Sequence, residues 1–194
     1  MTSKRIATAA LAVLTLLVVP AVAKEKKPMA DEFTAVFISM NAPGAMGSPV
    51  QIFIENYTTD AVAESLMTTL KTKGQAGLVN VLPNTRAGTI RIGTSDGYPI
   101  SIARSRQTTE GRVVIMASNR PFVGVGVGGV AGAESPIGFI QLNLNPDGTG
   151  TGTIIGAAQV TVDATNNLTI ASEAVQPGRL SDVKTKPKPK TQPN

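Results

Sequence analysis

The segment Gly93–Gly97 (Gly-Thr-Ser-Asp-Gly) has the Gly-x-Ser-x-Gly spacing of a hydrolase nucleophile elbow. In that elbow the serine lies on a sharp turn between a strand and a helix, and a histidine takes its proton. Here Tyr98-Pro99-Ile100 follows, which predicts a strand, and the chain contains no histidine. We therefore interpret the segment as a β-turn with a polar tip, and a hydrolase that uses Ser95 is the weakest functional hypothesis.

A second glycine motif, Gly124–Gly129 (Gly-Val-Gly-Val-Gly-Gly), has the Gly-x-Gly-x-x-Gly spacing of a dinucleotide-binding loop. That fingerprint requires a helix that starts directly after the glycines. The residues that follow include Ala133-Glu134-Ser135-Pro136, which do not favour a helix start. We interpret the motif as part of a strand, and no nucleotide or other cofactor is expected.

Alternating glycines are expected to leave one face of two strands without side chains, because residues two apart share a strand face. The two stripes are Gly124, Gly126 and Gly128, and Gly148, Gly150 and Gly152. Glycine inside a strand often marks curvature or the close approach of another group. Sheet curvature or close packing is the favoured interpretation, and the alternative is an interior site for a small apolar ligand.

Four arginines, Arg104, Arg106, Arg112 and Arg120, gather along one predicted hairpin. A guanidinium can bind a carboxylate or phosphate through two parallel hydrogen bonds. The cluster is therefore either an anion site or a solvated strand face balanced by Glu110.

Five carboxylates could act as acids or bases, and all lie in predicted turns: Asp96, Glu110, Glu134, Asp147 and Asp163. Carboxylates in turns are usually solvated or bonded to the local backbone. A hydrolase built on Asp96 or Glu110 is thus a weak alternative. The absence of histidine and cysteine from the chain excludes disulfides, zinc sites built from those residues and the commonest general base, and no metal site is predicted.

The first 23 residues have the layout of a secretory signal peptide. Lys4 and Arg5 precede an apolar run from Ile6 to Val19, and the segment ends on small residues at Ala23. We expect an exported protein, periplasmic or secreted, that carries no transmembrane segment after cleavage. No second hydrophobic run of spanning length follows.

The positive charge belongs to the ends of the chain. The formal net charge is +5, yet residues 31–183 contain nine basic and twelve acidic residues. Lysines concentrate in a charged lead-in, residues 24–30, and in a Lys/Pro tail, residues 184–194. A nucleic-acid partner is not expected, because such a partner requires a basic face on the fold. The tail could instead bind an anionic envelope polymer.

One β-rich domain is predicted for residues 31–183. Runs of β-forming residues predict strands at 33–40, 50–57, 88–92, 100–107, 112–118, 121–130, 137–145, 149–162, 168–174 and 179–183. Thr59 and the apolar spacing after it predict a helix near residues 60–73 that ends at Gly74, and residues 75–82 form a second helix or a strand. The expected fold is mainly β with a helical insertion (α+β), an antiparallel meander curled into a barrel or sandwich.

The chain contains several short segments in an order that resembles a known family. They are Gly97–Ile100, Ala103–Arg104, Arg120–Phe122, Pro136–Leu142, Ala157–Val160 and Gln176–Leu180. Together they resemble a family of uncharacterised exported bacterial proteins with no assigned function. The similarity covers about Phe33 to Val183. It implies export and a helix-inserted β layout, and it implies no activity and no site residues.

These observations favour a non-enzymatic binding protein of the cell envelope or secreted fraction, with a small apolar ligand as one candidate. The alternative from a different class is a surface structural or assembly protein that uses strand edges and the Lys/Pro tail. The oligomeric state is not predicted.

Overall fold

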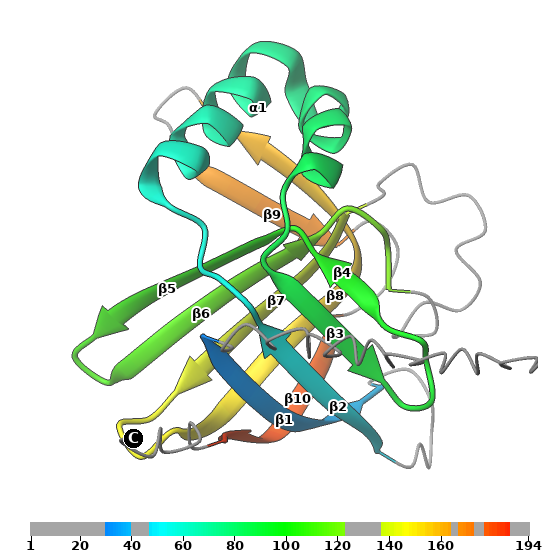
Figure 1. Cartoon of the computed structure of the whole chain (residues 1–194), viewed down its shortest axis with the longest axis vertical. Helices are drawn as coiled ribbons and strands as arrows, with labels where there is room; N and C mark the ends of the chain where they lie inside the picture. The colour runs from blue at the N-terminus through cyan, green and yellow to red at the C-terminus, as the bar shows by residue number, and fades with distance from the viewer. Residues whose placement is uncertain (1–29, 40–46, 123–136, 164–166, 173–176, 187–194) are drawn as a thin grey trace, which may run out of the picture.

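A computed structural model describes residues 30–39, 47–122, 137–163, 167–172 and 177–186 of the chain. The described elements, in chain order, are β1 (Asp31–Ile38), β2 (Ser48–Ile54), α1 (Asp60–Val81), the short 3₁₀ helix η1 (Leu82–Asn84), β3 (Gly88–Ile92), β4 (Tyr98–Ile100), β5 (Ile102–Thr108), β6 (Gly111–Ser118), β7 (Ile137–Leu144), β8 (Thr149–Val162), β9 (Leu168–Ser172) and β10 (Gly178–Thr185). The prediction of a mainly antiparallel β fold with a helix inserted after the second strand is confirmed (Figure 1).

The strands form one antiparallel sheet in the order β4-β3-β2-β1-β10-β8-β7-β6-β5, and β9 pairs with the distal half of β8. Most neighbours are consecutive in the chain, as a meander requires. The exception is β10, which pairs with β1 on one side and with β8 on the other. The last strand therefore joins the two halves of the meander.

The sheet curls into a nearly closed barrel rather than a sandwich. Closure depends on the chain around Ser101, where β4 pairs with β3 and β5 immediately afterwards pairs with β6. The amide of Ser101 donates a hydrogen bond to the carbonyl of Ala117 on β6 (2.8 Å). The amide of Thr58 donates a hydrogen bond to the carbonyl of Ala103 on β5 (2.8 Å). These bonds connect the β2–β3 side of the sheet to its β5–β6 edge.

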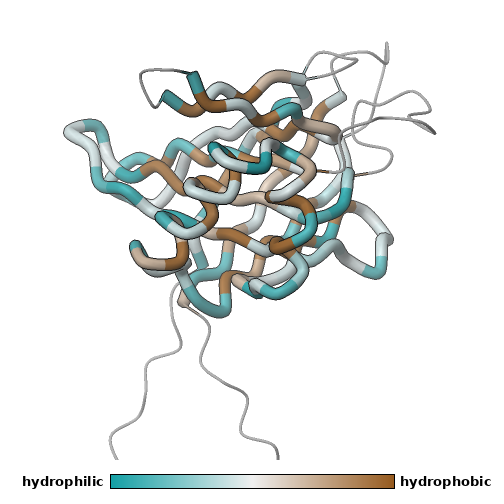
Figure 2. Tube along the Cα trace, turned by 90° about the horizontal axis from the view of Figure 1, so that it is seen from above, coloured by the Kyte–Doolittle hydropathy of each residue, from teal (hydrophilic) through white to brown (hydrophobic). Residues whose placement is uncertain are grey.

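The inner face of the barrel is the main hydrophobic core. Apolar and polar residues alternate along the strands (Figure 2), and this period of two sends every second side chain inward. Large side chains such as Phe33, Ile52, Ile90, Ile140 and Leu142 are completely buried there.

The outer face of the sheet is also buried over part of β7 and β8. In β7 the four consecutive residues Ile137–Ile140 are all buried, and so is the run Ile154–Ala158 in β8. Alternation is lost because α1 and β9 cover this part of the sheet from outside, as Figure 1 shows. A second core forms there between Leu66, Leu70 and the sheet.

α1 consists of two helical segments that meet at Gly74, whose φ of 65° and ψ of −169° are not helical. The side chain of Thr59 caps the first segment by accepting a hydrogen bond from the amide of Val62 (3.4 Å). The predicted end at Gly74 is thus confirmed for the first segment, and residues 75–81 form a second helix rather than a strand. Glycine permits this break because it adopts positive φ without steric cost. Val62, an apolar residue in the first turn of α1, is 38% exposed.

The boundary between the sheet and the C-terminal tail also differs from the sequence prediction. β10 continues to Thr185, so the first residues assigned to the Lys/Pro tail belong to the sheet. Lys186 then donates its backbone amide to the carbonyl of Glu32 (2.8 Å), and its ammonium pairs with that residue's carboxylate. The strand predicted at residues 121–130 lies almost entirely outside the described residues.

Candidate functional site

A cavity of about 590 Å³ lies between α1 and the outer face of the sheet. Its roof consists of apolar side chains of the helix, among them Ala63, Leu66, Met67 and Leu70. Its floor consists of apolar side chains of the strands, among them Ile102, Val113, Ile115, Ala117, Phe139 and Ile170. A volume of this size falls within the roughly 300–1,000 Å³ typical of small-molecule sites.

Strand register explains why the floor is apolar. Ile115 and Ala117 on β6 share one face, and the intervening Met116 points into the barrel, where it is buried. β6 therefore carries apolar residues on both faces, since its inner face fills the barrel and its outer face lies under the helix. Ile115 is 37% exposed and Leu168 on β9, also at the cavity, is 45% exposed. The helix thus covers the floor incompletely.

The helix is fixed over the sheet by apolar contacts and by one hydrogen bond that crosses to β8. Leu66, Leu70 and Leu78 are buried against the outer face. Beside the Gly74 break, Gln75 accepts a hydrogen bond from the amide of Val160 through its Oε1 (2.6 Å). This side chain takes the place of a neighbouring strand for that amide and connects the helix to β8.

Two of the four arginines from the predicted anion cluster lie at the cavity. Arg104 and Arg106 occupy alternate positions of β5, so both lie on its outer face, and both line the cavity. β5 is the last strand in the order of the sheet. Arg104 binds Asp60 at the start of α1 (2.7 Å) and donates to the carbonyl of Thr58 (3.0 Å). Arg106 is exposed and makes no ion pair with any residue that the structure describes.

No known family model, curated protein or solved structure matches this chain. The resemblance to a family of exported bacterial proteins therefore remains a prediction. The cavity and the charges at its rim are the observations from which a function can be inferred.

Arg112 does not join the other arginines, because it points to the inner face of the barrel. It binds the carboxylate of Asp31 (2.9 Å) and lies over the ring of Phe33 (5.6 Å to the centroid). The hydroxyl of Tyr57 donates to the same carboxylate (2.6 Å). Burial raises the pKa of Tyr57, and the hydrogen bond to Asp31 raises it further. Arg112 is therefore already paired with a carboxylate on β1.

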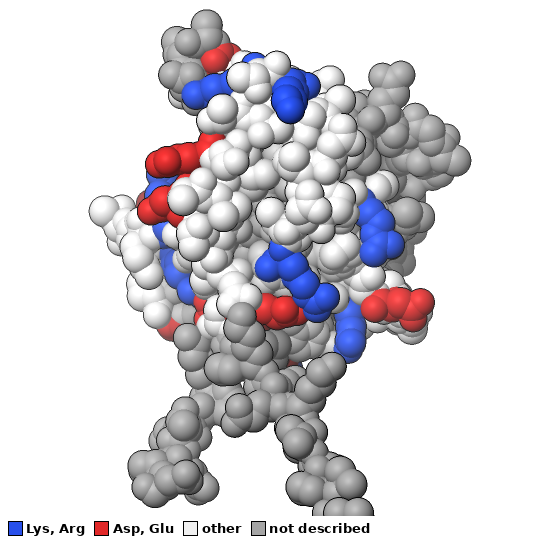
Figure 3. All heavy atoms as spheres, turned by 45° about the horizontal axis from the view of Figure 1, so that its top comes forward, with Lys and Arg blue, Asp and Glu red and all other residues white. Residues whose placement is uncertain are grey.

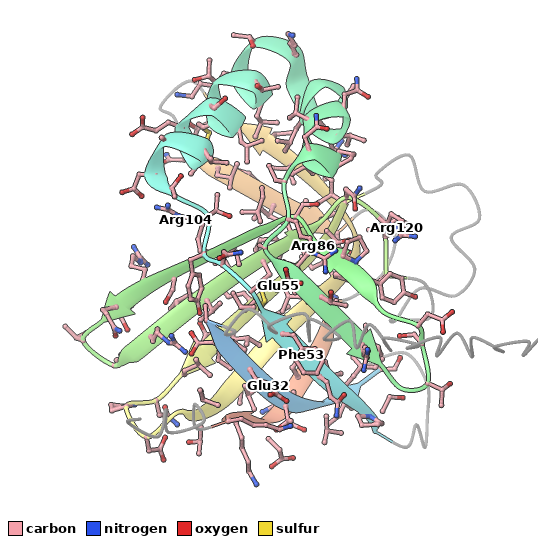
Figure 4. The ribbon with its side chains drawn as sticks, viewed as in Figure 1. Glu32, Phe53, Glu55, Arg86, Arg104 and Arg120 are labelled. Carbon is pink, nitrogen blue, oxygen red and sulfur yellow. The ribbon has the colours of Figure 1, made fainter. Side chains whose placement is uncertain are left out.

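Arg120 is also separate from the cavity. It follows the end of β6, beyond the residues that pair with β5, and Figure 4 shows the side chains of Arg104 and Arg120 far apart. The structure therefore does not bring the four arginines into one cluster, and Arg104 and Arg106 are the two that lie together at the cavity. Cations and anions are interspersed on the face seen in Figure 3, so that view shows no broad basic surface.

The described glycine stripe does not line the cavity under α1. Gly150 and Gly152 lie in the first half of β8, whereas Gly148 lies in the turn that precedes this strand and has a φ of 80°. A Cβ on Gly152 would lie 2.6 Å from the carbonyl oxygen of Gln141 and 2.8 Å from Leu142. A Cβ on Gly150 would collide with the carbonyl of Asn143. The stripe permits close packing inside the barrel, as the favoured interpretation held. Gly148 and Gly150 border two polar hollows beside the hairpins, whereas Gly124, Gly126 and Gly128 lie outside the described residues.

The turn residues have structural partners. Ser95 lies in the β3–β4 turn and accepts a hydrogen bond from the amide of Ile92 (3.0 Å), which confirms the turn interpretation of Gly93–Gly97. Asp147 accepts bonds from the hydroxyl and amide of Thr149, and these bonds lower the pKa of Asp147.

Asp163 in turn accepts a hydrogen bond from the amide of Asn167 (2.9 Å). Asp96 and Glu110 are exposed, and Glu134 lies outside the described residues. Among the residues that the structure describes, no three acidic side chains gather in a group that could hold a metal ion. No helix in the described part of the chain is long and apolar enough to cross a membrane.

Proposed function

We propose that the protein is an exported, non-enzymatic binding protein that holds a small, largely apolar molecule between α1 and the outer face of the sheet. The observation that carries this proposal is the apolar cavity of about 590 Å³ beneath the helix. Export is inferred from the signal-like residues 1–23 and places the protein in the periplasm, the envelope or the secreted fraction.

The chemistry of the lining favours binding over catalysis. The described lining residues include two arginines and one serine and are otherwise apolar, and they include no carboxylate. The chain offers no histidine or cysteine that could activate a nucleophile there. A site of this composition can hold an apolar molecule through burial, with polar contacts confined to its rim.

The incompletely covered floor supports the same proposal. Ile115 and Leu168 keep more than a third of their surface exposed although they adjoin a buried core. An apolar ligand would remove this surface from water, which contributes about 25 cal/mol for each Å² buried. The ligand would thereby complete a core that the helix leaves open.

Native mass spectrometry of the protein purified without denaturation tests the proposal. We expect an adduct that is lost on denaturation, and its mass identifies the class of ligand. The variant Ala63→Phe places a ring in the cavity and should lose the adduct. The matched variant Ala61→Phe, on an exposed position of the same helix, should keep it.

An unliganded mass in the native protein, with no binding of the neutral apolar dye N-phenylnaphthylamine, would contradict the proposal. An unliganded oligomer that dissociates when residues 187–194 are removed would instead favour an assembly role for the tail. Equal loss of the adduct in both variants would place the ligand elsewhere.

A further inference from the structure

We propose that the ligand is an amphipathic anion, with one apolar chain and one acidic group, and that Arg106 binds the acidic group together with Arg104. This inference rests on the proposed function, because it assigns the chemical class of the molecule that occupies the cavity under α1.

The charged side chains that line the cavity are both cationic. Its described lining contains two guanidinium groups and no acidic side chain. Arg104 and Arg106 are two positions apart along an extended strand, so their backbones lie about 6.6 Å apart on one face. A ligand that lies along the apolar floor and ends at β5 would present its terminal group to both.

The two arginines differ in the ion pairs that they form. Arg104 is held by Asp60 and by the carbonyl of Thr58, and its side chain remains 42% exposed. Arg106, on the same face, has no ion-pair partner among the described residues. The site therefore combines a fixed cation with an uncompensated one, and Arg106 is the principal contact.

A carboxylate suits this arrangement because guanidinium groups bind it through two parallel hydrogen bonds. A neutral head group such as an alcohol would leave the charge of Arg106 unused. A cationic head group would be repelled by both arginines. The rim thus discriminates between ligands that the apolar cavity alone would accept equally.

Three probes with the same alkyl chain test this inference on the full chain: dodecanoate, dodecanol and dodecyltrimethylammonium. Dodecanoate and dodecyltrimethylammonium are titrated below their micelle concentrations, and dodecanol below its solubility limit, against bound N-phenylnaphthylamine. From the displacement of the dye, we expect the affinity for dodecanoate to be about five- to tenfold higher than that for dodecanol, and the affinity for the cation to be the lowest. Added salt should reduce this preference, because the ion pair is near the surface.

Substitutions identify the residue responsible. Arg106→Gln should abolish the preference for dodecanoate while the affinity for dodecanol and the dye is retained, which shows that the variant is folded. Arg120→Gln, beyond the end of β6 and outside the cavity lining, should change neither. Asp60→Asn removes the carboxylate that competes for Arg104, and we expect it to raise the affinity for dodecanoate alone.

The outcomes separate this inference from the proposed function. Equal binding of dodecanoate and dodecanol, both blocked by Ala63→Phe, would overturn the acidic-group assignment and leave the cavity as a ligand site. Failure of the dye and of all three probes to bind would overturn both proposals. If Arg106→Gln and Arg120→Gln weaken dodecanoate equally, the preference reflects net charge and the assigned site is wrong.

Discussion

Filling the cavity should stabilise the protein and at the same time impair its binding. Ala117 lies on the outer face of β6 and lines the cavity floor, so Ala117→Leu directs three additional carbon atoms into this space. At about 0.8 kcal/mol per buried methylene, complete burial would add about 2.4 kcal/mol to the free energy of unfolding. Partial exposure of the cavity and lost leucine rotamer freedom of about 0.5–1 kcal/mol reduce this gain, and we expect about 1 kcal/mol.

Urea unfolding followed by circular dichroism measures the change in the ligand-free protein, and the melting temperature should rise by about 2–4 °C. Binding of N-phenylnaphthylamine should weaken by about tenfold or more, since each 1.4 kcal/mol of lost contact energy is tenfold in affinity. The control is Ala171→Leu, at an exposed position on β9. It adds the same atoms outside the cavity and should change neither quantity appreciably.

Two results would refute the reasoning. Destabilisation by Ala117→Leu would show that the space beneath the helix is already filled, because overpacking typically costs about 1–3 kcal/mol. Stabilisation with unchanged dye binding would show that the space exists and that the ligand lies elsewhere.

Two further substitutions test the elements around the site. Gln75→Ala leaves the amide of Val160 without its acceptor, and urea unfolding should show a loss of about 1–3 kcal/mol. Gln75→Glu keeps an acceptor and should lose less, whereas equal losses would contradict the role of this bond. Because the pKa of Tyr57 is raised in the folded state, the folded protein holds the phenol proton more tightly than the unfolded chain does. The contribution of Tyr57 to the free energy of unfolding is complete below the unfolded pKa of about 10. It is lost as pH rises above that value, by less than about 1.4 kcal/mol per pH unit. Tyr57→Phe should remove this part of the alkaline decline, and an unchanged decline would contradict the assignment.

Local patterns predicted most of the elements because their causes are local. The turn between β5 and β6, the cap at Thr59 and the break at Gly74 each depend on residue types within a few positions. The insertion of β10 between β1 and β8 has no such signal, since it depends on pairing between the two ends of the chain.

The candidate site was missed because the arginines were grouped by proximity in sequence. Hairpin register separates them: with Thr108 opposite Gly111, Arg106 faces Val113 and Arg112 faces Gln107. Neighbouring positions on a strand point to opposite faces, so Arg106 and Arg112 cannot share a site. In Val113–Ala117 and Ile137–Ile140, residues that point to both faces of the sheet are apolar. This pattern indicates that the sheet is covered on both faces.

Methyl NMR of isoleucine side chains during titration with dodecanoate tests the central claim most directly, because isoleucines mark both faces of the sheet. Ile115, Ile137 and Ile170 lie at the cavity, whereas Ile52 and Ile90 lie inside the barrel. We predict saturable shifts of the first group while the second stays unchanged. Shifts confined to the barrel interior, or no saturable shift in either group, would contradict the claim that the cavity under α1 is the binding site.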